Sequence, residues 1–268
     1  MQKTAFYTKL NSGEIIYMLD VLQTQRRYYV FDKNTFKHFL KVCNSLTTYK
    51  LEKPTKRKST DIFYDSAKNI LEENGLLLRK RVYGSKSKIK IKRRIDHKQY
   101  FYSDALRSHE REKEVPTRDP LSKHYFFLNN ALNSMFTNTL QFDPDKLFDQ
   151  MRVILTIDIK ENCYKMFGGG GLKAEIREQH LKFTNYRTKR KSTCDLIQIV
   201  MLSDDNTLPY FEDFYKRVEK HCKEIFYTTD SRYEIGERMT KPLPTKEELK
   251  QLRIQRLKEQ EMNGGDQK

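Results

Sequence analysis

The sequence predicts an α+β protein built on an antiparallel sheet, with about eight strands and about three main helices. Two observations predict this class. Apolar residues recur at helical spacing in residues 32–46, 121–136 and 208–226. From Asp61 onward the period changes to two, which is typical of half-buried strands. Short strands joined by turns fit either an open antiparallel sheet or a barrel.

Four elements are expected before residue 61. Residues 12–23, SGEIIYMLDVLQ, are interpreted as a short helix. The first strand is RRYYVF, residues 26–31, and the amphipathic helix 32–46 follows it. Residues 50–60, which contain a proline and many lysines, are expected to form a basic loop.

The remaining strands follow from the period of two. Segments 76–84 and 88–94 are expected to form an antiparallel pair that turns at Gly84 and Ser85. The glycines at 168–171 connect two expected strands rather than a strand and a helix, so they predict a turn and not a phosphate-cradling loop. The full set of expected strands after the basic loop is 60–65, 76–84, 88–94, 110–116, 151–167, 172–183 and 194–202.

Composition narrows the classes of partner and compartment. The formal charge of +16 favours acidic partners such as nucleic acid, polyphosphate, nucleotides or an anionic membrane surface. No apolar run approaches the roughly 20 residues that span a bilayer, and the N-terminus lacks a secretory signal. The four cysteines lie far apart, which predicts buried free thiols rather than disulfides or a zinc site. A protein of the cytoplasm or another reducing compartment, not secreted, is expected.

The chain divides into three parts by composition. Residues 1–25 are expected to be an N-terminal extension, and 26–240 the main domain. Residues 241–268 are almost wholly charged and are expected to form a helix or a tail that binds a protein partner. Thr245 and Glu248 have the spacing of a capping box at its start.

One stretch carries the functional argument. LLLRKRVYGSKSKIKIKRR, residues 76–94, places nine Lys or Arg among nineteen residues. Because alternate side chains of a strand share a face, Arg79 and Arg81 point one way and Lys80 points the other, while Lys88, Lys90 and Lys92 share one face of their strand. The residues that share faces in this way are Arg79 with Arg81, then Lys88, Lys90 and Lys92, then Glu110, Glu112 and Glu114. These faces either turn inward and hold a polyanion, or are solvent faces of an ordinary sheet.

The same residues resemble a known family. The segments IFYDSAKNILEENGLLLRKRVYG, KIKIKRR and EREKEV are similar to the CYTH, or triphosphate-tunnel, superfamily. The matching residues are Tyr64, Asp65, Asn74, Gly75, Leu78, Arg79, Arg81, Lys90, Lys92, Arg111, Glu112 and Glu114. The helix at 208–226 followed by SRYEIG resembles the VTC-like polyphosphate-polymerase branch. The segment LKAEIREQHLKF, residues 172–183, resembles a strand of the same branch that ends in an aspartate, and Glu178 stands in the place of that aspartate.

The resemblance implies an eight-stranded antiparallel barrel around a tunnel. It also implies phosphate-binding residues, which in this sequence are Arg79, Arg81, Lys90, Lys92, Arg111, Arg187 and Arg232. Active members of the superfamily hydrolyse or transfer phosphoryl groups with Mg²⁺ or Mn²⁺ held by glutamates. The first and last strands here carry Arg26, Tyr28, Gln198 and Val200 at those glutamate positions. Such side chains do not supply the anionic oxygens that divalent ions require.

Three hypotheses follow. The first is a degenerate tunnel that binds a triphosphate, a polyphosphate or an RNA end without efficient catalysis and without a cofactor. The second is a metal-dependent triphosphatase or polyphosphate polymerase that uses relocated carboxylates, with Glu112, Glu114, Glu175 and Glu178 as the candidates. The third is a structural component of a larger ribonucleoprotein or viral assembly. Two basic segments that share the sequence TKRKS, around residues 54–59 and 186–192, could also grip nucleic acid.

Overall fold

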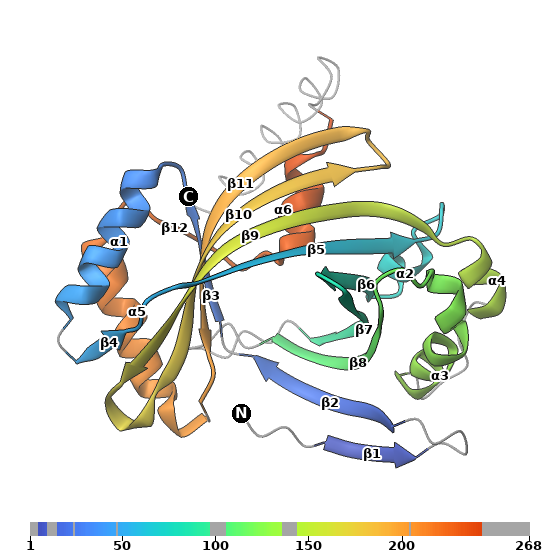
Figure 1. Ribbon diagram of the computed structural model, residues 1–268, viewed down its shortest axis with the longest axis horizontal. Helices are drawn as coiled ribbons and strands as arrows, with labels where there is room; N and C mark the ends of the chain where they lie inside the picture. The colour runs from blue at the N-terminus through green and yellow to red at the C-terminus, as the bar shows by residue number, and fades with distance from the viewer. Residues whose placement is uncertain are drawn as a thin grey trace, which may run out of the picture.

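A single antiparallel sheet of 12 strands organises the protein (Figure 1). The computed structural model describes residues 5–9, 15–23, 25–46, 48–96, 106–135, 144–203 and 205–242. The strand order is β1-β2-β8-β7-β6-β5-β9-β10-β11-β3-β12, and β4 pairs with β9 beside this path. The strands are β1 (Ala5–Lys9), β2 (Ile15–Gln23), β3 (Gln25–Val30), β4 (Tyr49–Leu51), β5 (Thr55–Asp65), β6 (Leu76–Tyr83), β7 (Lys86–Asp96), β8 (Leu106–Pro116), β9 (Arg152–Gly168), β10 (Lys173–Asn185), β11 (Arg190–Met201) and β12 (Phe226–Thr228).

Helices cover both faces of this sheet. The described helices are α1 (Lys33–Ser45), α2 (Ile70–Glu73), α3 (Tyr125–Met135), α4 (Pro144–Asp149), α5 (Leu208–His221) and α6 (Arg232–Met239), with short 3₁₀ turns at Leu121–His124, Gly169–Gly171 and Asp205–Thr207. The three main helices expected from apolar spacing are therefore confirmed as α1, α3 and α5. Among the described helices, none combines the length and the apolar character needed to cross a bilayer.

The eight expected strands are confirmed, and they lie next to one another in the sheet as β8-β7-β6-β5-β9-β10-β11-β3. The sheet is strongly curved (Figure 1). Within the described residues its two ends do not pair with each other, because β2 occupies the outer edge of β8 and β12 occupies the outer edge of β3. The antiparallel α+β class is confirmed, with an open ladder and additional strands at both ends.

Two local predictions were wrong. The helix expected at 12–23 is the strand β2, which adds to the edge of β8 over seven residue pairs. A short apolar run does not distinguish helix from strand by its period alone. The basic loop expected at 50–60 is instead β4 and the start of β5, since Thr55–Asp65 pairs along β9. The expected C-terminal helix beyond Pro242 lies outside the described residues.

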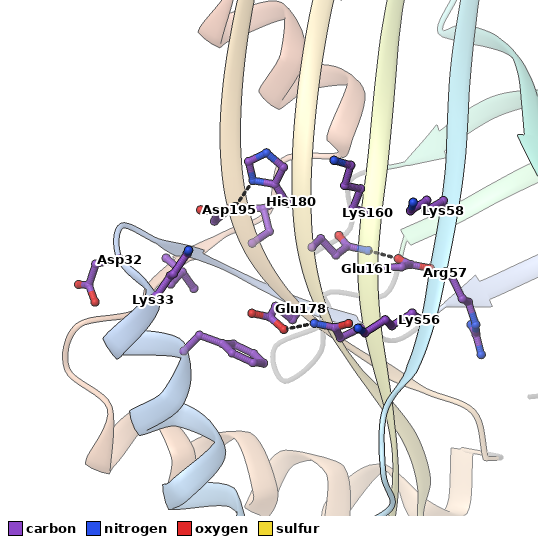
Figure 2. Close-up of a pocket in the computed structure, with 15 residues that line it drawn as sticks. Asp32, Lys33, Lys56, Arg57, Lys58, Lys160, Glu161, Glu178, His180 and Asp195 are labelled. Carbon is purple, nitrogen blue, oxygen red and sulfur yellow. Dashed lines mark hydrogen bonds and ion pairs between the residues drawn. The ribbon is translucent and has the colours of Figure 1, made fainter.

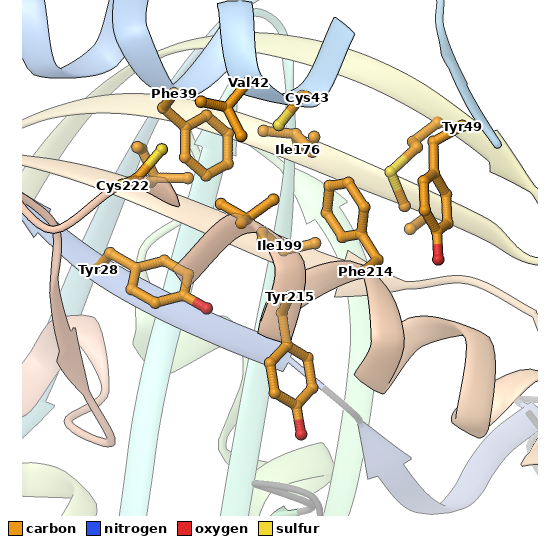
Figure 3. Packing of buried hydrophobic residues seen from close by; sticks show 14 of the residues in the cluster. Tyr28, Phe39, Val42, Cys43, Tyr49, Ile176, Ile199, Phe214, Tyr215 and Cys222 are labelled. Carbon is orange, nitrogen blue, oxygen red and sulfur yellow. The ribbon is translucent and has the colours of Figure 1, made fainter. Parts of the chain in front are cut away.

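Two apolar cores cover one side of the sheet, which we call the outer face. Helices α1 and α5 pack on β3, β10 and β11, where Tyr28, Ile176 and Ile199 meet Phe39 and Phe214 (Figure 3). The side chain of Asp32 fixes the start of α1, because it accepts hydrogen bonds from the backbone N–H groups of the first turn. The second core joins α3 and α4 to β6 and β7 through Leu78, Ile89, Ile91, Leu128 and Phe148.

Helix α6 packs on the opposite side, which we call the inner face. Tyr233 and Ile235 contact a core formed by Leu155 and Phe183 of β9 and β10. A Cβ at Gly236 would lie 2.7 Å from Phe183 and 2.9 Å from Leu155, so only glycine allows this approach. The capping box at Ser231 fixes the first turn of α6. The helix is thereby held against the sheet with its N-terminal residue, Arg232, over the inner face.

The four cysteines are free, as expected. Cys43, Cys163 and Cys222 are buried, and Cys194 is half-buried. Burial raises the pKa of Cys163 and Cys194 to about 12, so these thiols stay protonated at neutral pH and are poor nucleophiles.

Candidate functional site

The register of β6, β7 and β8 places alternate charged side chains of these strands on one face. Arg79 of β6 lies opposite Lys90 of β7, and Arg81 lies opposite Lys88. Lys90 in turn lies opposite Glu112 of β8. Because paired residues project to the same side of a sheet, these side chains form a continuous surface. The turn at Gly84, where φ is +60°, sets this register as predicted.

The same surface continues into the other half of the sheet. Arg81 lies opposite Asp61 of β5, and the register then passes to Ile157 of β9 and Phe183 of β10. Phe183 is the residue on which α6 packs. The predicted alternation of cations therefore does line the inner face. Further inner-face residues by the same register are Arg57, Glu161, Glu175, Arg177, Gln179, Gln198, Gln25 and Arg27.

Asp61 is the buried anion at the centre of this face. It is 1% exposed and accepts two hydrogen bonds from Arg81, at 2.5 Å from Nε and 2.6 Å from Nη2. Arg79 lies 3.5 Å away and Arg232 lies 3.9 Å away. Burial acts to raise the pKa of Asp61, but the three guanidinium groups outweigh it and lower the pKa to about 2. Asp61 is therefore ionised throughout the physiological range and holds the arginines together.

Arg232 links the two halves of the inner face. From α6 it donates to Gln179 Oε1 at 3.2 Å and to Gln198 Oε1 at 3.0 Å, and it lies 3.8 Å from Glu161. Burial lowers the pKa of Arg232 to about 9, and the nearby Arg81 acts in the same direction. Because burial disfavours the charged form of Arg232, an additional anion beside it would stabilise that form.

On the inner face, the lysines of β7 lie opposite the glutamates of β8. Lys90 lies 2.6 Å from Glu110 and 3.0 Å from Glu112, and Lys88 lies 2.8 Å from Glu112. The lysines Lys90 and Lys92 bring the pKa of Glu110 down to about 2, against the opposite effect of its burial. The side chains of Lys88, Lys90 and Lys92 remain 34%, 20% and 28% exposed, so a ligand can reach their ammonium groups.

Arg79 has unused capacity for hydrogen bonds. Its Nε is buried and, within the described part of the chain, has no hydrogen-bond acceptor. The nearest carboxylate oxygen to the Arg79 guanidinium group is Asp61 Oδ2, which lies 3.5 Å from Nη1 and already accepts a hydrogen bond from Arg81. A buried donor without a partner costs about 1–3 kcal/mol, and a phosphate oxygen at this point would remove that cost.

Five of the seven predicted phosphate-binding residues lie on the inner face: Arg79, Arg81, Lys90, Lys92 and Arg232. Arg111 does not, because its neighbours Glu110 and Glu112 take the inner face and the strand period sends Arg111 outward. It is buried there and donates to Ser134 of α3 at 3.1 Å. Arg187 lies in the turn after β10, where it contacts Asp65 at 3.4 Å and Glu72 at 3.2 Å.

The predicted carboxylates separate in the same way. Glu112 and Glu114 lie on the inner face opposite Lys90 and Lys88. Glu178 lies on the outer face, where it accepts a hydrogen bond from Asn162 at 2.5 Å. It therefore does not join Glu112 and Glu114 in one cluster.

The substituted family positions are also divided between the faces. Gln198 and Val200 lie on the inner face of β11. Arg26 and Tyr28 of β3 point outward, where both donate to Glu219 of α5, at 3.1 Å and 2.7 Å. The residues that β3 contributes to the inner face are Gln25, Arg27 and Tyr29. This strand thus supplies no carboxylate there in either register.

Sequence reasoning did not name two inner-face carboxylates, Asp61 and Glu161, and it did not predict the partners of Glu175. Asp61 lies in the expected strand TDIFYD. Its pairing with Arg81 could not be predicted, because the segment that contains α2 separates β5 from β6. Glu175 lies 2.9 Å from Arg57 and 2.5 Å from Arg177. Arg57 belongs to the segment expected to be a loop. Extending the period of two back to residue 55 would have placed Arg57 in a strand.

The inner-face carboxylates do not fit a divalent cation by their donor set. Mg²⁺ and Mn²⁺ require several oxygen ligands free to coordinate at one point. In the described residues, no group of three His, Cys, Asp or Glu side chains converges in this way. Instead, Asp61, Glu110, Glu112 and Glu175 each contact Lys or Arg within 3.0 Å. These acids organise the cations of the face.

Comparison with known proteins gives similarities of fold. No protein-family model and no curated protein matches the sequence. The Hippeastrum protein HpAC1, described as an adenylyl cyclase candidate with a dominant triphosphatase activity, is 16% identical, with a TM-score of 0.47 over 83% of this chain and 98% of that one. An adenylate cyclase candidate from Bacillus halodurans is 11% identical, with a TM-score of 0.46 over 80% and 96%. The mimivirus capping enzyme triphosphatase is 7% identical, with a TM-score of 0.32 over 74% and 89%.

Proposed function

We propose that the inner face binds a phosphate-rich anion such as a triphosphate or polyphosphate, without efficient turnover and without a metal cofactor. The observation that carries this proposal is the convergence of Arg79, Arg81, Lys90, Lys92 and Arg232 on one face, with the Arg79 Nε left without an acceptor. Planar guanidinium groups bind phosphate oxygens in pairs, and lysines supply mobile point charges. The binding domain proposed from the sequence, residues 26–240, contains all of these residues.

The charge distribution favours a ligand with several phosphates. Arg81 and Arg79 lie on β6, while Lys88, Lys90 and Lys92 follow the neighbouring strand β7. Successive lysines on one face are about 6.6 Å apart along an extended strand. A single phosphate cannot contact all of these groups, whereas a chain of linked phosphates can. Protein partners of the charged segment 241–268 remain a separate proposal.

A metal-dependent triphosphatase or polyphosphate polymerase is the second candidate. It is favoured by Glu110, Glu112 and Glu114, which project from β8 in one row on the inner face. For these carboxylates to hold Mg²⁺ or Mn²⁺, they would have to exchange Lys88 and Lys90 for the ion. Release of phosphate that requires the metal and stops with chelator distinguishes this candidate from simple binding.

Thermal unfolding tests the first proposal. Tripolyphosphate in the presence of chelator is expected to raise the melting temperature by about 5–10 °C at a hundredfold excess over its dissociation constant. The reason is that ligand binding to the native state then adds about 2.7 kcal/mol, which for a domain of this size corresponds to about 2–4 °C per kcal/mol. Sodium sulfate at matched ionic strength is the control. An equal rise with sulfate would contradict a specific site.

A further inference from the structure

The outer face of β5, β9 and β10 is hollowed beside the N-terminus of α1. One hollow of about 510 Å³ and another of about 420 Å³ share Lys58, Lys160 and His180 in their walls. Figure 2 shows these three side chains in a row across the strands, on the side away from α6. This surface is separated from the inner face by the thickness of the sheet.

Five exposed lysines cross this surface, and we call them the lysine path: Lys56, Lys58, Lys160, Lys182 and Lys191. Lys58 lies directly opposite Lys160, and Lys160 lies opposite His180. Lys182 is two residues along β10 from His180, and Lys191 is opposite Thr184, two residues further. The path therefore runs diagonally over β5, β9, β10 and β11. By ordinary strand dimensions it is about 25 Å long.

The path places like charges next to one another. Lys58 lies directly opposite Lys160, and like charges in this arrangement destabilise a sheet. Asp158 lies opposite Lys182 in the register, but its side chain accepts a hydrogen bond from Thr60 at 2.9 Å. Of the other carboxylates near the path, Glu178 accepts a hydrogen bond from Asn162 at 2.5 Å and Asp195 lies 2.6 Å from His180. Among the described residues, no lysine of the path forms an ion pair.

We propose that the lysine path binds the phosphate backbone of single-stranded nucleic acid, at a site distinct from the inner face. A compact anion would engage only the neighbouring Lys58 and Lys160. A row of cations about 25 Å long can contact several successive phosphates of an extended single strand. The path ends at the turn between β10 and β11, where Tyr186 is 53% exposed. An exposed tyrosine beside a basic groove gives a base a surface on which to stack.

Fluorescence anisotropy with a labelled oligouridine of about 20 nucleotides, longer than the 4–16 nucleotides of a typical single-strand site, tests this proposal. The variant Lys58→Glu/Lys160→Glu/Lys182→Glu is expected to bind at least about tenfold more weakly than the native chain. Its salt dependence should fall by about 2 in slope, because each lost phosphate contact removes about 0.7 for a single strand. The matched control Lys37→Glu/Lys41→Glu/Lys220→Glu changes the net charge equally at exposed helix positions and should stay within about threefold. Equal weakening of both variants, or unchanged binding by the first, would overturn the proposal.

Two further variants separate this site from the inner face and from other polyanions. Arg79→Ala should leave the affinity for oligouridine unchanged. A loss of affinity in this variant would mean that the nucleic acid enters the inner face. Tyr186→Ala should weaken oligouridine binding without changing the binding of long-chain polyphosphate, because only the former has bases to stack. Equal effects on both ligands would overturn the assignment to nucleic acid. The triple variant should also keep the thermal response to tripolyphosphate, which shows that it is folded.

Discussion

Replacing Asp61 by asparagine is expected to lower the free energy of unfolding by about 3–5 kcal/mol, the cost of leaving buried charges without their partner. Asp61 is 1% exposed and is the nearest carboxylate to both Arg79 and Arg81. Without its charge, Arg79, Arg81 and Arg232 repel one another at close range. Because both arginines of β6 keep 23% of their surface exposed, we expect the lower end of this range. Urea unfolding of both proteins measures the difference.

The control for this prediction is Asp158→Asn, which makes the same chemical change on the neighbouring strand. Asp158 is exposed on the outer face and accepts one hydrogen bond from Thr60. Its replacement should cost less than about 1 kcal/mol. A cost for Asp61→Asn no greater than that of the control would contradict the central role of Asp61.

The stability difference between the native chain and Asp61→Asn is expected to depend on pH. Asp61 titrates at about 2 in the folded protein and at 3.8 when unperturbed, so its folded-state pKa is depressed. Its contribution to stability is therefore complete above about pH 4 and is lost as the pH falls through about 2. The difference in stability between the native chain and Asp61→Asn should shrink over that interval. Tripolyphosphate should restore part of the lost stability at neutral pH, because it supplies the missing negative charge.

Replacing Arg79 by alanine is expected to weaken the binding of tripolyphosphate by about 10- to 100-fold. A hydrogen bond to a charged group contributes about 1.5–3 kcal/mol, and Arg79 has the buried Nε without an acceptor. Isothermal titration calorimetry measures the change in the dissociation constant. Arg79→Lys keeps the charge but loses the planar fork, so its affinity should lie between those of the native chain and the alanine variant.

Arg111→Lys is the matched control for Arg79. Arg111 lies on β8, which pairs with β7 beside Arg79. Its side chain projects to the outer face, where it donates a hydrogen bond to Ser134. Lysine keeps the charge and a hydrogen-bond donor near the two acceptors of Arg111, the Ser134 hydroxyl and the main-chain carbonyl oxygen of Glu110. Tripolyphosphate affinity should change less than about twofold. Equal losses for Arg79→Lys and Arg111→Lys would mean that net charge, and not the inner face, determines binding.

The sequence was sufficient to predict eight of the 12 strands and most of the cations that share the inner face. A period of two in residues 76–94 fixes which side chains share a face, and a short glycine turn fixes how β6 and β7 pair. Arg79, Arg81, Lys90 and Lys92 therefore lie together as expected. The same period contradicts the family motif at Arg111, since adjacent residues of a strand cannot both face the ligand. Alternation was the better guide at that position.

Other features depend on contacts between distant segments. The faces of β3 could not be assigned before its pairing with β11 was known, and a shift of one residue exchanges Arg26 and Tyr28 for Arg27 and Tyr29. The position of Arg232 over the inner face depends on the close approach of α6 at Gly236. The pairing of Asp61 with Arg81 joins strands separated by α2. Short-range periodicity carries no information on such contacts.

The most direct test is a calorimetric titration of the native chain with tripolyphosphate, once with chelator and once with Mn²⁺. In the proposed function Lys and Arg alone hold the anion, so saturable binding of similar affinity is expected in both conditions and should weaken with salt. Binding that occurs only with Mn²⁺ would contradict this account, because it would mean that the carboxylates of β8 exchange their lysines for a metal ion.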